Sequence, residues 1–524
     1  MSEINIKIES ILGGINPAQY FNVDNGYNSA IAIDPDLPVG TDKKTSGMLV
    51  PSLYQDFTTT HVDGNPMWIL TNNKNTLIYV YCDNGAFVSY TAAFASETDL
   101  TKPTSGNGSG AAYYNNYIYL GTPTNIARYG PLNGTPAIAQ NVWTAATLGS
   151  QTALTDLTYP TIQGVEIPNH PMHVHPSNNI LYFGDVNTGR GMIHQIETKK
   201  TSAEGDTDDN SDYNIVPLPF GFYPTDIESY GAYLVVAAIQ TTSASSDQGS
   251  AALFFWDTNA EHFFNRVDIA DPLITALQNV NGLLYIFSGN SSSGFRISKY
   301  IGGDSVREVA YFEDGHPPFA GAVEAIGSKM MFGSMTNYPE ISASVFSFGS
   351  KRGDLPQKLH NVIRSNATAA DTPRITSMKK TQQSSNVEPK VIVGWGDGSG
   401  YGVDKSGTGT FNSVWRSELF KINKPFYIER IRIPLGIKLA ANMEIVLKLI
   451  VDDGSATKTL QTINTTNYTA GARKIIYKPQ ELLTDEANGV NNFMLELNWG
   501  GSTELPVLLP IEIDVVTTDD ESND

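Results

Sequence analysis

Short apolar runs, each introduced by a tight turn, recur along the chain. In the stretch Val280–Gly289, the pair Asn281-Gly282 leads directly into the apolar run Leu283–Phe287. Asn-Gly is a strong β-hairpin signal because both residues tolerate a positive φ. The same order of a polar or small pair and an apolar run recurs at Lys74-Asn75 with 76–81, Asn115-Asn116 with 117–121, Asn178-Asn179 with 180–184, Gly231-Ala232 with 233–237 and Gly327-Ser328 with 329–333. The chain is therefore predicted to repeat one hairpin-based unit.

Each repeat is predicted to hold four strands. The strands before the turn are 66–70, 110–114, 171–175, 225–230, 274–280 and 321–326. Third strands follow at 86–91, 125–129, 192–197, 252–257, 295–300 and 342–348, and fourth strands at 142–144, 213–218, 262–269, 306–312 and 358–363. A weaker seventh unit is expected at 374–379, 390–394, 400–404 and 413–420.

This period predicts an all-β fold whose main part is a β-propeller. The matching positions of the second strands are Tyr79, Tyr119, Tyr182, Val235, Tyr285 and Met331, and their spacings run from 40 to 63 residues. Units of about 40–50 residues with four strands are typical of propeller blades, which bury their faces by radial stacking. We expect about seven blades, or six if the last unit belongs to the next domain, with the strand 48–57 closing the ring. The tyrosines are expected to pack between blades.

The pattern divides the chain into four segments. Residues 1–45 are expected to form an extended arm, in which Ile4, Ile6 and Ile8 alternate with polar residues and could make one strand. The propeller is expected over 46–420. From Lys421 the strands become longer, and the period-2 alternation of 426–433 is typical of a half-buried strand. We therefore predict a jelly-roll-like β-sandwich over 421–516 and an acidic tail over 517–524.

Charge and composition narrow the classes of partner. The 524 residues carry a formal charge of −20, which favours solubility and argues against a grip on nucleic acid, since that requires a basic surface. An acidic surface could border a path that DNA passes without sticking. The chain has one cysteine, Cys82, in an apolar strand, so no disulfide within the chain is possible and a buried thiol is expected.

Two further absences in the sequence bear on location. The segment Met1–Glu9 lacks a basic region followed by an apolar run, and no stretch approaches 18 apolar residues. We therefore expect a chain made in the cytoplasm without a signal peptide and without a membrane span.

Candidate metal sites are weak. In His170-Pro-Met-His173-Val-His175, two histidines at alternate strand positions could present imidazoles to zinc, although a third ligand is not evident. The alternative is the first strand of a blade with surface or loop histidines. The oxygen-rich loop Asp206–Asp212 could hold Ca²⁺, but it lacks the Gly and terminal Glu of the helix-loop-helix pattern. We predict no metal and no cofactor.

Motifs for catalysis or adhesion are equally sparse. Arg352-Gly-Asp354 matches a tripeptide read by integrins, and Gly394–Gly400 loosely resembles the Asp-containing turns of sialidase propellers, but with Trp395 first. No nucleophile elbow and no phosphate loop is present. Carboxylates are numerous, yet nothing selects two of them as a glycosidase pair. We therefore assign no catalytic residue and expect no enzyme.

The N-terminal segment carries one family resemblance. Residues Lys7–Gly14, Pro17–Phe21 and Ala32–Pro38 look like the start of virion proteins of tailed bacteriophages. Tail components of such phages often contain propeller and sandwich modules. The resemblance implies a structural tail protein located in the virion, made in the cytoplasm of the host and assembled with other tail proteins. It transfers no catalytic residue.

Three hypotheses follow from these observations. The first is a structural protein of a phage tail that forms a ring-like homo-oligomer and acts through contacts between subunits. The second is an adhesin that binds host-surface glycans through loops at a propeller face or through the sandwich, and mutation of exposed aromatic residues near one face would test it. The third is a polysaccharide-degrading enzyme on a propeller scaffold, which would need two facing carboxylates.

Overall fold

The computed structural model describes most of the chain. The described residues are 2–11, 14–15, 26–31, 33–34, 54–55, 63–72, 76–91, 97–123, 125–143, 170–187, 190–198, 209–241, 249–289, 294–312, 317–334, 344–349, 359–364, 374–381, 390–396, 400–406, 413–422, 426–451, 456–479, 492–501 and 505–517. Apart from one 3₁₀ turn, Ala320–Ala322, the regular structure in these ranges is β-strand, as predicted. Contacts divide the chain into one compact unit of residues 57–343 and 365–405, and a second of residues 1–56, 344–364 and 406–524.

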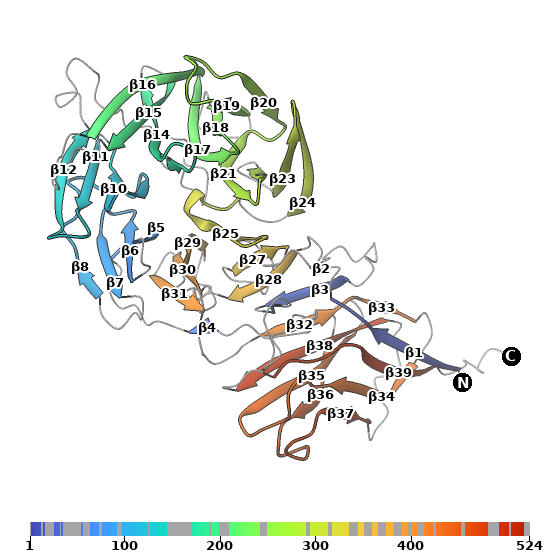
Figure 1. Cartoon of the computed structure of the whole chain (residues 1–524). Helices are drawn as coiled ribbons and strands as arrows, with labels where there is room; N and C mark the ends of the chain where they lie inside the picture. The colour runs from blue at the N-terminus through green and yellow to red at the C-terminus, as the bar shows by residue number, and fades with distance from the viewer. Residues whose placement is uncertain are drawn as a thin grey trace. The chain divides into compact units, whose positions relative to one another are not determined.

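Among the described strands, seven four-stranded sheets follow one another between β4 (Tyr54–Gln55) and β31 (Tyr401–Ser406) (Figure 1). The first three are β5 (Pro66–Thr71) to β8 (Glu97–Asp99) with β6 (Leu77–Cys82) and β7 (Phe87–Thr91); β9 (Ala111–Tyr114), β10 (Tyr117–Gly121), β11 (Ile126–Gly130) and β12 (Ala137–Trp143); and β13 (Met172–His175), β14 (Ile180–Asn187), β15 (Arg190–Thr198) and β16 (Asp209–Phe220). The fourth and fifth are β17 (Phe222–Tyr230), β18 (Tyr233–Thr241), β19 (Gly249–Trp256) and β20 (Asn265–Ile269); and β21 (Leu273–Val280), β22 (Leu283–Gly289), β23 (Phe295–Gly302) and β24 (Ser305–Phe312).

The last two sheets complete the series. The sixth is β25 (Val323–Ile326), β26 (Lys329–Ser334), β27 (Ser344–Phe348) and β28 (Leu359–Arg364). The seventh has the order β29 (Arg374–Thr381), β30 (Lys390–Gly396), β31 (Tyr401–Ser406) and β4 (Tyr54–Gln55). Its outer strand thus comes from the N-terminal side of the chain, within the segment 48–57 predicted to close the ring.

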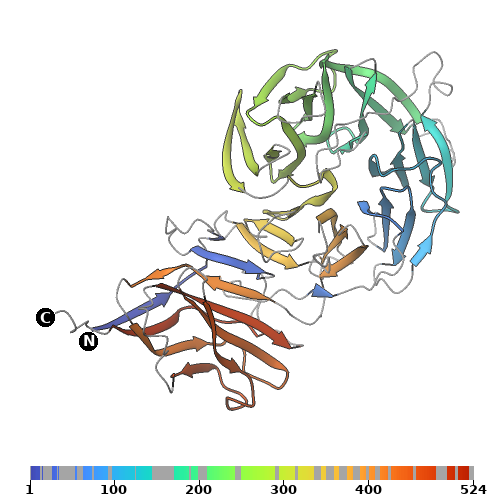
Figure 2. The same ribbon diagram turned by 180° about the vertical axis from the view of Figure 1, so that it is seen from behind.

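The first strands of the seven sheets form a closed circle. Each of β5, β9, β13, β17, β21, β25 and β29 contacts the first strand of the next sheet, and β29 contacts β5. The sheets radiate from this circle, and the view from behind shows the same order (Figure 2). The ring is therefore a β-propeller with seven sheets, which confirms the predicted blade type and decides between six and seven.

The predicted hairpins are confirmed where the structure describes them, although the turn at Asn178-Asn179 takes four residues, 176–179, and Lys74-Asn75 lies outside the described residues. Asn281 and Gly282 both have a positive φ (51° and 81°), as do Asn115 and Asn116 (47° and 65°). Two successive positive φ values produce a turn whose twist matches that of the flanking strands. These pairs therefore join the first and second strands of their sheets.

The tyrosines of the second strands pack between sheets, as predicted. All six matching positions of the second strands are buried. Tyr182 of β14 meets Trp256 of β19 edge-on, with ring centroids 5.6 Å apart, and so joins the third sheet to the fourth. Burial raises the pKa of Tyr79 to about 12. Cys82 is buried as expected.

Besides β4, β27 and β28, which pair in the sixth and seventh sheets, the second unit contains two sheets that share one core. The first has the order β1 (Ser2–Ile8), β39 (Ile511–Thr517), β34 (Phe426–Pro434) and β37 (Lys474–Tyr477). The second has the order β2 (Gly14–Ile15), β3 (Gly26–Ile31), β32 (Val414–Ser417), β38 (Asn492–Gly501), β35 (Met443–Val451) and β36 (Ala456–Ile463), with β33 (Phe420–Lys421) also on β38. One apolar cluster joins Ile431 and Ile513 of the first sheet to Trp415, Leu447 and Leu497 of the second.

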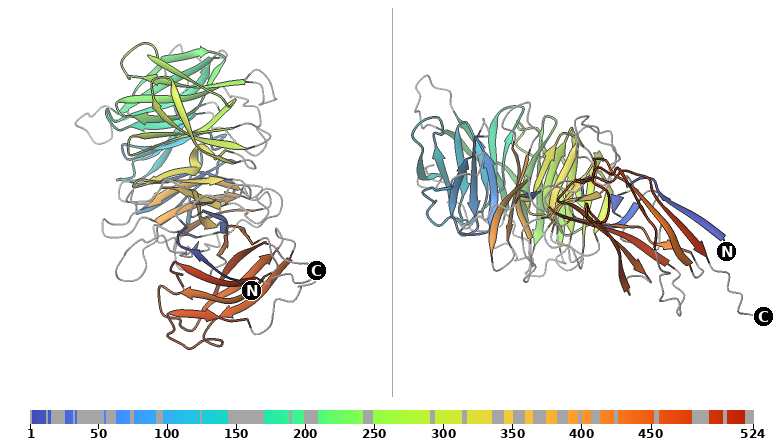
Figure 3. Two further views of the ribbon diagram at one scale, coloured as in Figure 1. Left: turned by 90° about the vertical axis from the view of Figure 1, so that its right-hand side faces the viewer. Right: turned by 90° about the horizontal axis from the view of Figure 1, so that it is seen from below.

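Strand pairing in this unit differs from the expected segment limits. From the expected arm, β1 pairs with β39 along its whole length, from Ser2 opposite Thr517 to Ile8 opposite Ile511 (Figure 3). The predicted fourth strand of the seventh repeat, 413–420, is wrong: β32 pairs with β3 and β38 instead. The physical reason is that Trp415 is fully buried in the shared core of the two sheets. Residues 518–524 of the expected tail lie outside the described ranges.

Within the described ranges, no helix has the length and apolarity needed to cross a membrane.

Candidate functional site

The three histidines of the metal-like motif do not form one site. His173 and His175 do occupy the first strand of a blade, β13, as expected. The prediction of surface or loop positions is wrong for His170 and His175, which are almost completely buried. Among the residues that the structure describes, no three His, Cys, Asp or Glu side chains are placed to share a metal ion.

The other sequence candidates are only partly covered by the structure. Arg352-Gly-Asp354 and the side chains of Asp206–Asp212 lie outside the described residues. Gly394, Trp395 and Gly396 form the end of β30, and 397–399 are again outside the described ranges.

His170 belongs to a buried polar group with Asp185 and His194. Its Nδ1 lies 3.2 Å from the carbonyl oxygen of Gly184 and 3.8 Å from Oδ1 of Asp185, while Nε2 of His194 lies 3.5 Å from Oδ2 of the same carboxylate. Burial lowers the pKa of His170 and outweighs the opposing effect of Asp185. We therefore assign His170 a neutral imidazole that donates from Nδ1 to Gly184. The two imidazoles thus flank one buried carboxylate.

A second polar group lies on the first strands of the blades, and the sequence had not singled it out. This inner-strand cluster consists of His173 on β13, Asp226 and Glu228 on β17, Asn279 on β21, Glu324 on β25 and Lys379 on β29. First strands are edge strands, so part of their backbone N–H groups have no partner within their own sheet. Such groups need acceptors when they are removed from water.

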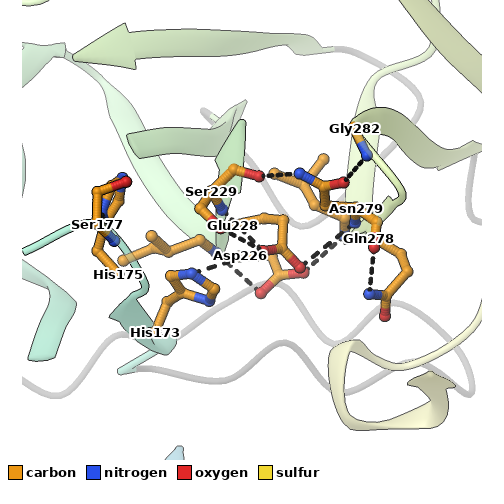
Figure 4. Close-up of polar contacts among 11 residues, drawn as sticks. His173, His175, Ser177, Asp226, Glu228, Ser229, Gln278, Asn279 and Gly282 are labelled. Carbon is orange, nitrogen blue, oxygen red and sulfur yellow. Dashed lines mark hydrogen bonds and ion pairs between the residues drawn. The ribbon is translucent and has the colours of Figure 1, made fainter. Parts of the chain in front are cut away.

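Asp226 supplies an acceptor to the neighbouring blade (Figure 4). Its Oδ2 accepts a hydrogen bond of 2.6 Å from the backbone N–H of Leu277 on β21, and its Oδ1 accepts one of 2.8 Å from the N–H of Ile227. Burial raises the pKa of Asp226 well above its usual value, and the nearby carboxylate of Glu228 adds to this effect. Burial of this carboxyl group is therefore unfavourable by itself. The group nevertheless forms a hydrogen bond that joins two blades.

Glu228 stands two residues further along the same strand. Its Oε1 accepts from the N–H of Ser229 at 2.8 Å and lies 3.5 Å from Nε2 of His173. Its Oε2 lies 3.5 Å from the N–H of Asn279 on the next blade. The Asn279 side chain donates to the carbonyl of Ser229 at 2.7 Å and accepts from the N–H of Gly282 at 2.9 Å. Side-chain hydrogen bonds therefore join the blades of β17 and β21, and Glu228 also contacts His173 of the preceding blade.

Lys379 provides the positive charge of the cluster. Its Nζ lies 2.9 Å from Oε2 of Glu324 on the preceding blade. The Glu324 carboxylate, and more weakly that of Glu228, raise the pKa of Lys379. The carboxylates of the cluster are thus held by backbone N–H groups and a lysine, with His173 beside Glu228, which is the arrangement of a structural clasp between blades. A glycosidase would instead need two carboxyl groups turned toward a substrate.

Exposed aromatic side chains form a separate feature of the fourth blade. Tyr233, at the start of β18, is 39% exposed, and Phe264, just before β20, is 52% exposed. Their ring centroids lie 4.7 Å apart. Aromatic faces of this kind offer a platform to apolar faces of ligands. Phe220, at the end of β16, is more exposed at 72%, but the guanidinium of Arg190 stacks on its ring.

The inner-strand cluster left only a faint signal in the sequence. Asp226 and Glu228 alternate on a strand whose other residues are apolar or small, which marks them as residues on one side of an inner strand. Their acceptor role depends on the backbone of the next blade, about 50 residues away, and no local pattern encodes it.

Comparison with known proteins finds only distant structural similarity. No protein-family model matches the chain, and no curated protein sequence matches it. Among solved structures, the β-propeller domain of Cps50 (Swd1) from Myceliophteria thermophila superposes with a TM-score of 0.41 at 10% identity, covering 66% of this chain and 99% of that domain. The Dos1 propeller gives a TM-score of 0.41 at 12% identity, covering 68% of this chain and 95% of that structure. The assignment of a seven-sheet propeller to this chain rests on its own strand pairing and the closed circle of first strands.

Proposed function

We propose that this chain is a structural component of a tailed-phage virion, most simply a tail protein that acts through contacts between subunits. The observation that carries the proposal is the likeness of Lys7–Gly14, Pro17–Phe21 and Ala32–Pro38 to the start of such virion proteins. In this proposal the chain is not an enzyme, binds no cofactor and resides in the particle after synthesis in the host cytoplasm.

The architecture is compatible with a rigid building part. Neighbouring blades are joined by the inner-strand cluster and by buried tyrosines, so the propeller would serve as a spacer or platform. The two sheets of the second unit would form a jelly-roll-like β-sandwich that docks onto other tail proteins. The charge of −20 would keep the surface from trapping DNA.

The test is the composition of purified particles. Particles are banded on a density gradient, and peptides of this chain are quantified by mass spectrometry against the major capsid protein. We expect a fixed stoichiometry that survives a second gradient, and density for a seven-bladed ring in a reconstruction of the tail. Loss of the chain on repurification, as for a contaminating host protein, would contradict the proposal.

A second candidate function is the binding of host-surface glycans. The observation that favours it is the exposed pair Tyr233 and Phe264, since aromatic faces are common platforms for ligands with apolar faces. On a glycan array, we expect Phe264→Ala to reduce binding about tenfold, the equivalent of one lost aromatic contact. Phe220→Ala is the matched control, because Phe220 is exposed but stacked under Arg190. No bound glycan with the unaltered chain, or equal losses for both variants, would exclude this function for the pair.

A further inference from the structure

Strand β1 forms one edge of its sheet. In the order β1-β39-β34-β37 it pairs with β39 on one side, and on the other side no described strand pairs with it. An edge strand presents a row of backbone N–H and C=O groups that favours pairing with another strand. Proteins protect such edges with short strands, prolines or bulges, but β1 is seven residues long, has no proline and keeps a regular register with β39.

The exposure of the β1 side chains is also consistent with pairing at this edge. Ile8 is buried in the core, while Ile4 of the same strand face is 38% exposed. Glu3, Asn5 and Lys7 occupy the opposite face and are exposed. The strand therefore offers one uncovered apolar side chain and one charge of each sign.

The sequence Ser-Glu-Ile-Asn-Ile-Lys-Ile of β1 is complementary to itself when reversed. If two copies pair antiparallel about Asn5, Glu3 of each copy stands opposite Lys7 of the other. The same register places Ile4 of each copy opposite Ile6 of the other, which covers the exposed Ile4. Opposite charges and apolar pairs directly across two strands stabilise antiparallel pairing.

We infer that β1 is an interaction surface for the β1 strand of a second copy of this chain. The pairing runs about a two-fold axis through Asn5 and joins two four-stranded sheets into one of eight strands. A two-fold contact is self-complementary and closes at two copies, unlike the head-to-tail contacts of a ring. The inference stands on the strand itself and does not depend on a place in a virion.

The test measures the mass of the full chain in solution. Sedimentation equilibrium or light scattering is run up to about 100 µM, where a small interface of this kind is populated. We expect a dimer for the unaltered chain. Glu3→Lys replaces both opposite-charge pairs by like-charge pairs, and we expect it to raise the dissociation constant about tenfold or more.

Two further variants keep the inference falsifiable. The double variant Glu3→Lys/Lys7→Glu restores both opposite-charge pairs and is expected to recover most of the dimer. Lys474→Glu, on the opposite edge strand β37, is the matched control and should leave the dimer unchanged. Thermal unfolding of each variant checks that β1 stays folded against β39.

Two results would overturn the inference. A chain that stays monomeric over the whole concentration range has no such interface, and a dimer that Glu3→Lys leaves intact uses another surface. A dimer found for a chain that is absent from virions would contradict only the proposed function. A chain present in virions but monomeric and insensitive to Glu3→Lys would contradict only the present inference.

Discussion

Asp226, Glu228 and Lys379 show how the first strands of the propeller hold ionisable groups that are partly removed from water. Asp226 accepts from two backbone N–H groups, and Lys379 faces Glu324 at 2.9 Å. Each charged group has its partner on another blade or on its own strand. Removing one partner should therefore cost more than the pair itself contributes, since the remaining group loses its compensation.

The pair Lys379–Glu324 gives the first prediction. In Lys379→Met the Glu324 carboxylate, which is almost buried, loses its ammonium partner. We expect the free energy of unfolding to fall by about 1–3 kcal/mol, measured by urea titration at neutral pH. Lys380→Met is the control, because Lys380 is exposed and its hydrogen bond among the described residues goes to the carbonyl of Ala325. Equal effects of both variants would contradict the assigned role of Lys379.

The buried His170 gives a prediction about pH. Its pKa is lowered in the folded state by burial, so the unfolded chain binds protons more readily. This contribution to stability is present above the unfolded pKa of about 6.5 and is lost as the pH falls toward the folded pKa. We expect His170→Gln to be less stable than the unaltered chain at neutral pH, but to lose less stability between about pH 7 and pH 5.

Denaturant midpoints at several pH values measure this slope. His262→Gln is the control, since His262 is exposed and lies outside the buried group. A slope that is unchanged by His170→Gln would show that His170 is not the group that titrates.

At the scale of elements, the tight hairpins define the blades. Asn281 and Gly282 hold the positive φ values of a two-residue turn, and the strands that follow such turns carry the buried tyrosines. Local sequence dictates these turns because few residue types tolerate both positive angles. The repeat of such turns is therefore encoded locally, independently of the partner strands.

Gly282 allows a test of the turn without steric interference. A Cβ at Gly282 would meet nothing within 4 Å, so Gly282→Ala changes only the conformational preference at a φ of +81°. We expect a loss of about 1 kcal/mol in the free energy of unfolding, measured by urea titration.

Gly134→Ala is the matched control, because Gly134 is not among the residues with positive φ and its Cβ would make ordinary contacts from 3.4 Å. We expect it to stay within about 0.5 kcal/mol of the unaltered chain. A harmless Gly282→Ala would mean that the turn does not need its positive angle.

At the scale of the whole molecule, the propeller depends on the junction between its first and last blades. Thr376 and Ser377 of β29 both donate hydrogen bonds to the carbonyl oxygen of Pro66 on β5. All three residues are buried, and the carbonyl of the first blade therefore receives two hydrogen bonds from the last blade. These two hydrogen bonds therefore join the first strands of the first and last blades.

We expect substitutions at this junction to have non-additive effects on the free energy of unfolding. Thr376→Val or Ser377→Ala alone leaves the Pro66 carbonyl one donor, so each should cost less than about 1 kcal/mol. The double variant leaves the buried carbonyl unsatisfied, and we expect it to cost about 1–3 kcal/mol more than the sum of the single changes. Urea unfolding of the four proteins measures this coupling.

Thr275→Val provides the control for this cycle. Thr275 lies at the corresponding bulge of β21 and is buried, but its hydroxyl has no hydrogen-bond partner among the described residues. We expect the change to be neutral or slightly stabilising, since it removes an unsatisfied polar atom. Additive single changes at Thr376 and Ser377 would contradict the shared role of the Pro66 carbonyl.

The sequence by itself determined the parts of this protein that are local. Turn pairs such as Asn281-Gly282, the alternating strands and the tyrosines at matching positions predicted the all-β class, the blades and the packing between them. Period-2 alternation and positive φ act over a few residues, so a single chain segment reveals them.

Only the tertiary structure decided which distant segments meet. It placed β1 on β39, gave β32 to the second unit and brought Asp226 to the N–H groups of the next blade. It also buried His170 and His175, which the sequence suggested for the surface. The physical reason is that these outcomes depend on pairing between edges and on burial, and residues far apart in the chain set both.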